Sequence, residues 1–524
     1  MAFSNNVKES ILIPGSLPIE ILDHVFSYLC HDTKFLHSCL LVNRIWCQHV
    51  VGLLWRAPFS IWLEEYKSIS LINTYISCMN DEEKSWLKKN GINVSTDTTN
   101  PLFNYSSYLK VFDNCGLDMS VKTWFIHSKC ISKEKDCLII DADRRIILSE
   151  ILYKLFFRQN LEFTQLTFLR KPSIFDIPSP FIFTLHPSLI SQLRVLRLNF
   201  AYTTESGRFK NLVNLVAILP NLCKKLRELD ICLQIIDVNL VADFIQSQEN
   251  LQDFRLECYS GNIAPAISAL QFQSDSLVRV EFSQIQFSGI ALDALVLCKN
   301  LRILCLIRCK GLTSFTWLPL KKAEFKLQTL YVRECETTQE FLESAIETAN
   351  YHLNELFMSY SSPKIIESIM KFCPSIKTFE VDIKPSSTNK FLILLTKLVL
   401  LERLSVSLLI YDASDFLTTL PNFLPTSLFD LKLEFQNTPR NLVSFLKKCR
   451  APIQILTVFS ILGVDNELVG FITKFAKESD TLRKVLINDW SGRKLVFHKY
   501  SEVWTTCSLK PRDRINNIRN YQYI

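Results

Sequence analysis

A short hydrophobic pattern recurs along most of the chain. It has the form apolar-x-x-apolar-x-apolar, and neighbouring copies begin between 23 and 33 residues apart. Alternation of this kind predicts a half-buried β-strand, and stretches with helical spacing, such as 238–248 and 340–349, lie between copies. The twelve copies begin at Leu193, Leu226, Leu251, Leu277, Leu301, Leu327, Leu353, Ile376, Leu401, Leu428, Ile453 and Leu482, and a weaker copy begins at Phe163.

Each copy with its following segment predicts one strand and one helix. Such a unit cannot bury its own apolar side chains, whereas a stack of units builds a continuous core with a parallel sheet along one side. We therefore predict an α/β fold in which residues 161–490 form a solenoid, with parallel strands on one face and helices on the other. The alternative is a generic α/β protein whose strands begin with leucine.

The stretch from Leu17 to Arg56 has a different pattern, with three short amphipathic helices. Ser16 is expected to cap the first helix, with Pro18 in its first turn, and Asp32 is expected to cap the second. About forty residues cannot hide this much apolar surface alone, which predicts a protein partner or docking on the rest of the chain. The apolar positions are Ile21, Leu22, Val25, Phe26 and Leu29, then Phe35, Leu36, Cys39 and Leu40, then Val42, Trp46, Cys47, Val50, Leu53 and Leu54.

The same stretch resembles the F-box, the helical module that docks substrate receptors onto the Skp adaptor of cullin-type ubiquitin ligases. The alternative is that its residues are the ordinary core of an N-terminal helical cap. The resemblance rests on Leu17-Pro18 before Glu20-Ile21-Leu22, on Phe26-Ser27-Tyr28-Leu29, on Val42-Asn43-Arg44 with Trp46, and on Leu54-Trp55-Arg56. It implies an F-box over residues 11–60 whose adaptor-binding residues are Leu17, Pro18, Ile21, Leu22, Val42, Trp46 and Leu54.

The repeats resemble the cysteine-containing leucine-rich repeats of F-box proteins, in degenerate form. Their period lies mostly within the 20 to 29 residues of that repeat class. The expected Asn or Cys after the pattern is present at Cys309 and Cys335 and missing at Ala201, Gln234 and Tyr259. Residues 61–160 are expected to form a mainly helical connector, and residues 491–524 a C-terminal cap with a basic tail.

Composition narrows the possible functions. The chain has 524 residues, of which 48% are hydrophobic and 21% charged, as in a folded soluble protein. Its net charge of +7 comes from 59 basic and 52 acidic residues spread along the chain, so we expect no nucleic-acid binding. It has neither a Gly-rich phosphate loop nor a catalytic motif, and its 17 cysteines lack zinc-site spacing. We accordingly expect no catalytic residues, no metal and no cofactor.

The sequence also predicts a location. The most apolar window, 391–410, contains Lys397, Glu402 and Arg403, so no membrane span is expected. The N-terminus lacks a continuous apolar signal region and the cysteines lack a disulfide pattern. Both features predict a cytoplasmic or nuclear protein with reduced thiols.

The strand positions between the apolar residues predict which side chains face outward. Early copies present mostly acidic residues, with two arginines that could neutralise them, and middle copies present an apolar and aromatic group typical of a binding hot spot. The C-terminal tail or the connector packing over this group is the alternative. The predicted substrate-binding residues are Glu228, Asp230, Asp253, Glu257, Ile303, Ile307, Tyr331 and Phe357.

Together these features predict a substrate-recognition subunit of a cullin-type ubiquitin ligase. The resemblance implies that the F-box binds the Skp adaptor and, through it, a cullin and a RING protein, while the repeats hold a target protein. Catalysis would then belong to other subunits. Two alternatives are a protein-binding scaffold without ubiquitin transfer and a regulator of an enzyme.

Overall fold

The computed structural model describes residues 18–29, 32–60, 65–94, 101–127, 137–157, 162–169, 177, 179–199, 210–232, 237–259, 261–408, 414–435, 442–460, 466–489, 494–500 and 503–504. The chain forms two compact units, Met1–Leu226 and Arg227–Ile524. The domain boundaries predicted at residues 60, 160 and 490 remain predictions.

The described residues of the first unit are mostly helical and include three strands. The strands are β1 (Val111–Asp113), β2 (Gln165–Leu169) and β3 (Val195–Asn199), and they pair in parallel in that order. The helices are α1 (Ile19–Tyr28), α2 (Thr33–Cys39), α3 (Arg44–Leu54), α4 (Glu65–Ser77), α5 (Asp81–Lys89), η1 (Tyr105–Tyr108), α6 (Asn114–His127), α7 (Cys137–Phe157), α8 (Phe181–Leu185), α9 (Ser188–Ser191) and α10 (Lys210–Leu222).

An aromatic cluster joins the end of the N-terminal helices to the segment that follows them. The Phe59 ring stacks on the Tyr75 ring with centroids 5.7 Å apart and also packs against Phe112 and Phe156. Phe59, Phe112 and Phe156 are fully buried or nearly so. The segment 61–160 is thus packed against residues before it, and β1 is the one strand among its described helices and turns.

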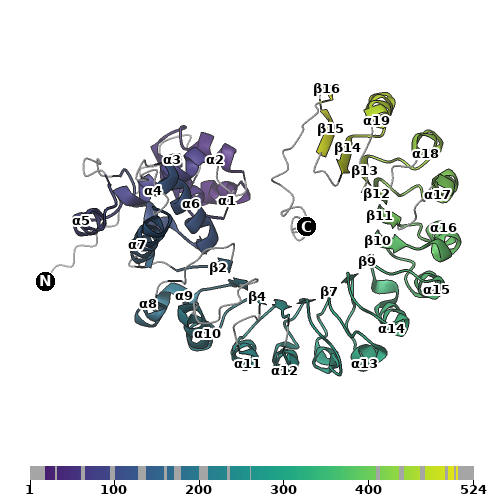
Figure 1. Cartoon of the computed structure of the whole chain (residues 1–524), viewed down its shortest axis with the longest axis horizontal. Helices are drawn as coiled ribbons and strands as arrows, with labels where there is room; N and C mark the ends of the chain where they lie inside the picture. The colour runs from purple at the N-terminus through teal and green to yellow at the C-terminus, as the bar shows by residue number, and fades with distance from the viewer. Residues whose placement is uncertain are drawn as a thin grey trace. The chain divides into compact units, whose positions relative to one another are not determined.

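The second unit is a parallel sheet with helices along one side (Figure 1). Strands β4 to β14 pair in sequence order, each parallel to the next. They are β4 (Glu228–Cys232), β5 (Asp253–Glu257), β6 (Arg279–Ser283), β7 (Ile303–Ile307), β8 (Thr329–Arg333), β9 (Glu355–Met358), β10 (Thr378–Ile383), β11 (Arg403–Leu408), β12 (Asp430–Phe435), β13 (Ile455–Ser460) and β14 (Lys484–Asp489).

Each of these strands begins two residues after the start of a copy of the sequence pattern. The first residue of each copy from Leu251 to Leu482 is at most 7% exposed, so these residues build the core between sheet and helices. In the first unit, β2 and β3 follow the copies at Phe163 and Leu193 in the same way. The predicted α/β fold with a long parallel sheet is confirmed.

The segments between strands carry the helices of the second unit. The longer ones are α11 (Val238–Gln246), α12 (Ala264–Ala269), α14 (Gln339–Ala349), α15 (Pro363–Phe372), α16 (Thr388–Lys397), α17 (Ser414–Thr419), α18 (Leu442–Lys448) and α19 (Asn466–Glu478). Shorter turns are η3 (Leu270–Gln273), η4 (Asp293–Leu297), α13 (Ser314–Trp317), η5 (Leu318–Lys322), η6 (Asn350–His352), η7 (Pro385–Ser387) and η8 (Leu420–Asn422).

The parallel run ends with two antiparallel strands. Strand β15 (Lys494–Tyr500) pairs antiparallel with β14, and β16 (Val503–Trp504) pairs antiparallel with β15. The tail cations Lys510, Arg512, Arg514 and Arg519 lie outside the described residues. Among the helices that the structure describes, none has both the length and the apolar character needed to cross a bilayer.

Two helical glycines predict opposite responses to the same substitution. A Cβ at Gly116 in α6 would lie 1.9 Å from the backbone oxygen of Phe59, whereas nothing lies within 4 Å of a Cβ at exposed Gly470 in α19. Gly116→Ala should therefore destabilise the protein by about 2–3 kcal/mol, and Gly470→Ala should be neutral or stabilise it by up to about 1 kcal/mol. Calorimetric unfolding of the two variants tests this, and equal shifts in Tm would contradict it.

Candidate functional site

The three N-terminal helices form a small module with side-chain caps. The Asp32 carboxylate accepts a hydrogen bond from the Phe35 N–H at 2.9 Å, and the Asn43 side chain accepts one from the Trp46 N–H at 2.9 Å. The cap predicted at Asp32 is therefore confirmed, and the role of Asn43 in the Val-Asn-Arg-x-Trp motif is to begin α3. Pro18 occupies the N-cap position of α1, just before the first turn and not within it as predicted, and Ser16 lies outside the described residues.

A compact core holds this module together. The Trp46 ring packs edge-on against the buried Phe26 ring with centroids 5.1 Å apart. The His49 Nδ1 lies 2.7 Å from the Asp23 Oδ1, which ties α3 to α1. The core comprises Leu22, Phe26, Leu36, Cys39 and Val50, with Leu29, Leu40, Trp46, Leu53 and Leu54 packed against it.

Apolar side chains also remain on the outside of the module. Among the described residues of the module, seven large apolar side chains are at least 38% exposed, and grouped exposed apolar residues are typical of interaction surfaces. This set is named the exposed helical face. It consists of Ile21, Val25, Tyr28, Phe35, Leu41, Val42 and Ile45.

The predicted adaptor-binding residues fall into three groups. Pro18, Ile21 and Val42 are exposed. Leu22 is buried, and Trp46 and Leu54 are half-buried against the core, so these three can only support the surface from beneath. Leu17 lies outside the described residues. Sequence reasoning did not single out Leu41 and Ile45, which sit beside the Val42-Asn43 signature in the α2–α3 turn and the first turn of α3.

In the second unit, the parallel register aligns outward side chains into rows that cross the strands. The side of β4–β14 that does not face the helices is named the open face. Its middle row runs Asp230, Arg255, Glu281, Cys305, Tyr331, Phe357, Glu380, Ser405, Lys432 and Thr457. The predicted substrate-binding residues occupy this row and the two rows beside it, on β4, β5, β7, β8 and β9.

Three of the acidic residues on β4–β6, Glu228, Asp253 and Glu281, lie beside arginines on the same sheet. Arg255 lies 2.9 Å from Asp253 and 3.9 Å from Glu228. Arg279 lies 2.7 Å from Glu281 and 3.9 Å from Asp253. Burial raises the pKa of Asp253, although the neighbouring arginines oppose this shift. Arg255 and Arg279 therefore already lie among three of the carboxylates of β4–β6.

The middle of the open face carries an apolar band, defined as Ile303, Ile307, Tyr331 and Phe357. All four side chains are half-buried, and the Tyr331 and Phe357 rings lie side by side with centroids 5.1 Å apart. Burial raises the pKa of Tyr331 to about 12, so its hydroxyl stays neutral. A pair of rings fixed by its neighbours is a preorganised contact for an apolar side chain.

On the far side of the apolar band lie three carboxylates that the sequence analysis did not select. They are Glu380 and Asp382 on β10 and Glu434 on β12, and they are named the acidic trio. Arg333 reaches across β9 to place its guanidinium 3.0 Å from Asp382 and 3.4 Å from Glu380. The same outward-position rule that selected Phe357 would have found all three, had it been continued past β9.

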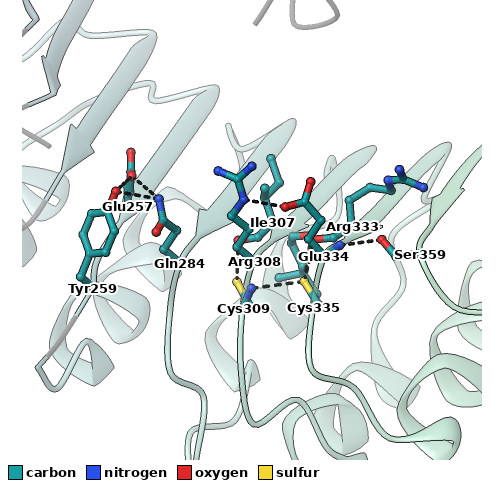
Figure 2. Close-up of polar contacts among 11 residues, drawn as sticks. Glu257, Tyr259, Gln284, Ile307, Arg308, Cys309, Arg333, Glu334, Cys335 and Ser359 are labelled. Carbon is teal, nitrogen blue, oxygen red and sulfur yellow. Dashed lines mark hydrogen bonds and ion pairs between the residues drawn. The ribbon is translucent and has the colours of Figure 1, made fainter. Parts of the chain in front are cut away.

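The edge where β6, β7 and β8 end has an unusual backbone. Gln284, Arg308 and Glu334 follow directly after these strands with φ of 58°, 52° and 55°, a region that favours glycine. Figure 2 shows the Arg308 and Glu334 side chains on the side opposite Cys309 and Cys335, joined by an ion pair of 2.7 Å. Each of these two positive-φ residues thus points its own side chain outward, while the cysteine that follows it points the opposite way.

The two cysteines of the repeat signature stabilise this edge. The Cys309 thiol donates to the Phe282 carbonyl at 3.3 Å, and the Cys335 thiol donates to the Leu306 carbonyl at 3.2 Å. The Cys309 N–H in turn donates to the Cys335 Sγ at 3.3 Å (Figure 2). Burial raises the pKa of the Cys309 thiol, so it acts as a neutral hydrogen-bonding group in the core.

Comparisons with known proteins agree with the helical module. Residues 15–60 match the model of the F-box-like family, so the resemblance to the F-box is confirmed. No curated protein sequence matches the chain. One similar solved structure is the leucine-rich-repeat ectodomain of the plant membrane receptor kinase GASSHO1/SCHENGEN3 from Arabidopsis thaliana, in complex with CASPARIAN STRIP INTEGRITY FACTOR 2. It is 12% identical with a TM-score of 0.26, and the match covers 65% of this chain and 46% of that one.

The strained edge predicts that Arg308 can be replaced by glycine without loss of stability. A non-glycine residue in the left-handed region costs about 1–2 kcal/mol, whereas an exposed ion pair such as Arg308–Glu334 contributes less than about 1 kcal/mol. Arg308→Gly should raise the free energy of unfolding by about 0.5–1 kcal/mol, and Arg308→Val should lower it because a β-branched residue fits this φ poorly. Urea unfolding of both variants measures the difference, and a less stable glycine variant would contradict it.

Proposed function

We propose that this chain, which carries an F-box-like domain at residues 15–60 ahead of a repeat solenoid, is a substrate-recognition subunit of a cullin-type ubiquitin ligase. The observation that carries the proposal is the pairing of two separate surfaces in one chain. The exposed helical face would bind the Skp adaptor, and the open face would bind the target protein.

The exposed helical face supports the first half of the proposal. Its apolar side chains are displayed by helices whose own core is already complete. The rest of the module's apolar surplus packs inward, since the Trp55 ring lies 5.5 Å from the Tyr75 ring on α4. What remains outside is therefore available to a partner, and an adaptor with an apolar surface would bury it.

The buried thiols support a role without catalysis. Burial raises the pKa values of Cys223, Cys298, Cys305 and Cys373 to about 12. Thioester chemistry needs a thiolate, which these four groups disfavour at neutral pH. Within the described residues, no group of three or more metal-binding side chains comes together. The mechanism proposed is proximity, in which the complex holds a target lysine near an activated ubiquitin.

Adaptor binding is tested by placing charges on the exposed helical face. Ile21→Glu combined with Val42→Glu should weaken binding of a purified Skp-type adaptor by about 100-fold or more, because both side chains are central apolar contacts of the proposed interface. Leu102→Glu is the matched control, since Leu102 is 82% exposed elsewhere in the first unit. Adaptor affinity is measured by calorimetry, and the Tm of each variant confirms that it folds. Unchanged affinity in the double variant would overturn the F-box part of the proposal.

The same double variant separates a ligase from a scaffold. It is preferable to deletion of the first 60 residues, because Trp55 and Phe59 are part of the core around α4. If the protein directs ubiquitin transfer, cells carrying Ile21→Glu with Val42→Glu should accumulate the bound target and lose its ubiquitin conjugates. An unchanged target lifetime would favour a protein-binding scaffold instead.

A further inference from the structure

We propose that the open face binds an extended target segment that places an apolar side chain on the Tyr331–Phe357 ring pair and a lysine or arginine, three or four residues away, beside Asp382 and Glu434. This inference rests on the proposed function only in taking the bound segment to belong to a target protein. It goes further by assigning the chemistry and the spacing that the segment must have.

The Tyr331–Phe357 ring pair is suited to bind an apolar side chain because its neighbours in the middle row are fixed by the sheet. Cys305 lies next to Tyr331 in the middle row and is buried, so the apolar surface continues from β7 to β9. The next residue in the row, Glu380, is charged and ends the apolar surface on that side. An apolar side chain that extended past Phe357 would meet the Glu380 carboxylate. The surface therefore favours a single apolar anchor followed by a polar or basic residue.

The acidic trio offers a site for a cation. The strand between Asp382 and Glu434 is β11, and it presents only Ser405 and Ser407 in the two corresponding positions. These side chains are short and uncharged, so a long basic side chain from a partner can lie over β11 between the two carboxylates. The hydroxyls are also hydrogen-bond acceptors for an ammonium or guanidinium group.

The charges of the trio are incompletely balanced in the free protein. Burial raises the pKa of Asp382, and Glu380 adds to the shift while Arg333 and Lys432 oppose it. Burial likewise raises the pKa of Glu434; Lys432 and Arg333 oppose this shift, and Asp382 and Glu380 add to it. The folded protein therefore holds these carboxylates in an environment that a further cation would improve. Groups that are unfavourable for the fold alone and grouped beside an apolar contact are typical of binding surfaces.

The strands on the two sides of the apolar band, β4–β6 and β10–β12, differ in which cations lie beside their carboxylates. On β4–β6, each arginine lies within 3.0 Å of one carboxylate and within 3.9 Å of a second. On β10–β12, Arg333 lies 3.4 Å from Glu380 and 3.0 Å from Asp382, and Lys432 and Arg333 oppose the rise in the pKa of Glu434. The positions that arginines fill among the carboxylates of β4–β6 are taken on β11 by Ser405 and Ser407, which leaves room for the basic end of the segment over β10–β12.

The strand spacing fixes the separation of anchor and cation. Adjacent strands lie about 4.8 Å apart, so the two steps from β9 to β11 span about 10 Å and the three steps to β12 about 14 Å. An extended segment crossing the strands advances about 3.3 Å per residue. Two side chains that are three or four positions apart along the segment span about 10–13 Å and match this distance, whereas adjacent residues do not reach.

The test uses fluorescent synthetic peptides and the purified full-length chain. Each twelve-residue peptide carries one tryptophan and one arginine, whose positions differ by one, three, four or eight. Control peptides replace the arginine with glutamate or the tryptophan with alanine. We expect the three- and four-residue spacings to bind at least about tenfold more tightly than the other peptides in anisotropy titrations, with weaker binding at high salt. Equal binding by all spacings, or no binding by any, would overturn the proposal.

Variants locate the two contacts. Phe357→Ala should weaken the best peptide by about tenfold or more, and Glu434→Gln by about fivefold, while the Tm of Glu434→Gln stays unchanged or rises. Glu367→Gln on α15, on the helical side of the sheet, is the charge-matched control. If Glu228→Gln weakens binding as much as Glu434→Gln does, the basic side chain lies on the other flank and the proposal is wrong.

Two other occupants are separate outcomes. A chain ending at residue 504 that binds the best peptide much more tightly than the full chain would show that residues 505–524 occupy the face, which overturns a target as its occupant. Self-association lost in Phe357→Ala would assign the face to a second copy, with the same consequence. Because these measurements need no adaptor, their failure leaves adaptor binding intact, and failure of adaptor binding leaves the peptide result standing.

Discussion

The second unit depends on one constraint, which is that no single repeat can bury its own apolar residues. The leucine at the start of each pattern is buried only because the neighbouring repeat supplies the next strand in parallel register. Register and burial therefore reinforce each other, since a slip by one residue would turn every core side chain toward the open face. The alignment of Tyr331 with Phe357, and of both with Glu380, follows directly from that register.

The N-terminal module likewise has more apolar residues than its own core can bury. Its three helices are short, but Asp32 and Asn43 cap two of them and Trp46 closes the core on Phe26. The surplus apolar surface has two destinations. Trp55 and Phe59 pack into the following helices, whereas Ile21 and Val42 stay exposed. The module is thus anchored at one end and free to bind at the other.

The open face combines features that a fold alone does not require. The turn residues Gln284, Arg308 and Glu334 adopt positive φ where glycine would fit better, and the edge is held by thiol hydrogen bonds from Cys309 and Cys335. Asp382 and Glu434 are held in surroundings that raise their pKa values. The positive-φ residues and the two carboxylates each cost some stability near the same apolar band, which agrees with the proposal that this part of the sheet binds a target.

The sequence by itself determined the strands, the Asp32 cap and the F-box-like character of residues 15–60. Local signals sufficed for these, because the spacing of leucines, the Asp32 cap and the Leu-Pro and Val-Asn-Arg-x-Trp motifs each act over a few residues. The tertiary structure decided which outward residues meet. Arg333 pairs with Asp382, which is 49 residues away, and Arg255 is shared by Asp253 and Glu228 on different strands. Charge balance depends on such neighbours across strands, so only the folded register could move the candidate cation site from β4–β6 to the acidic trio.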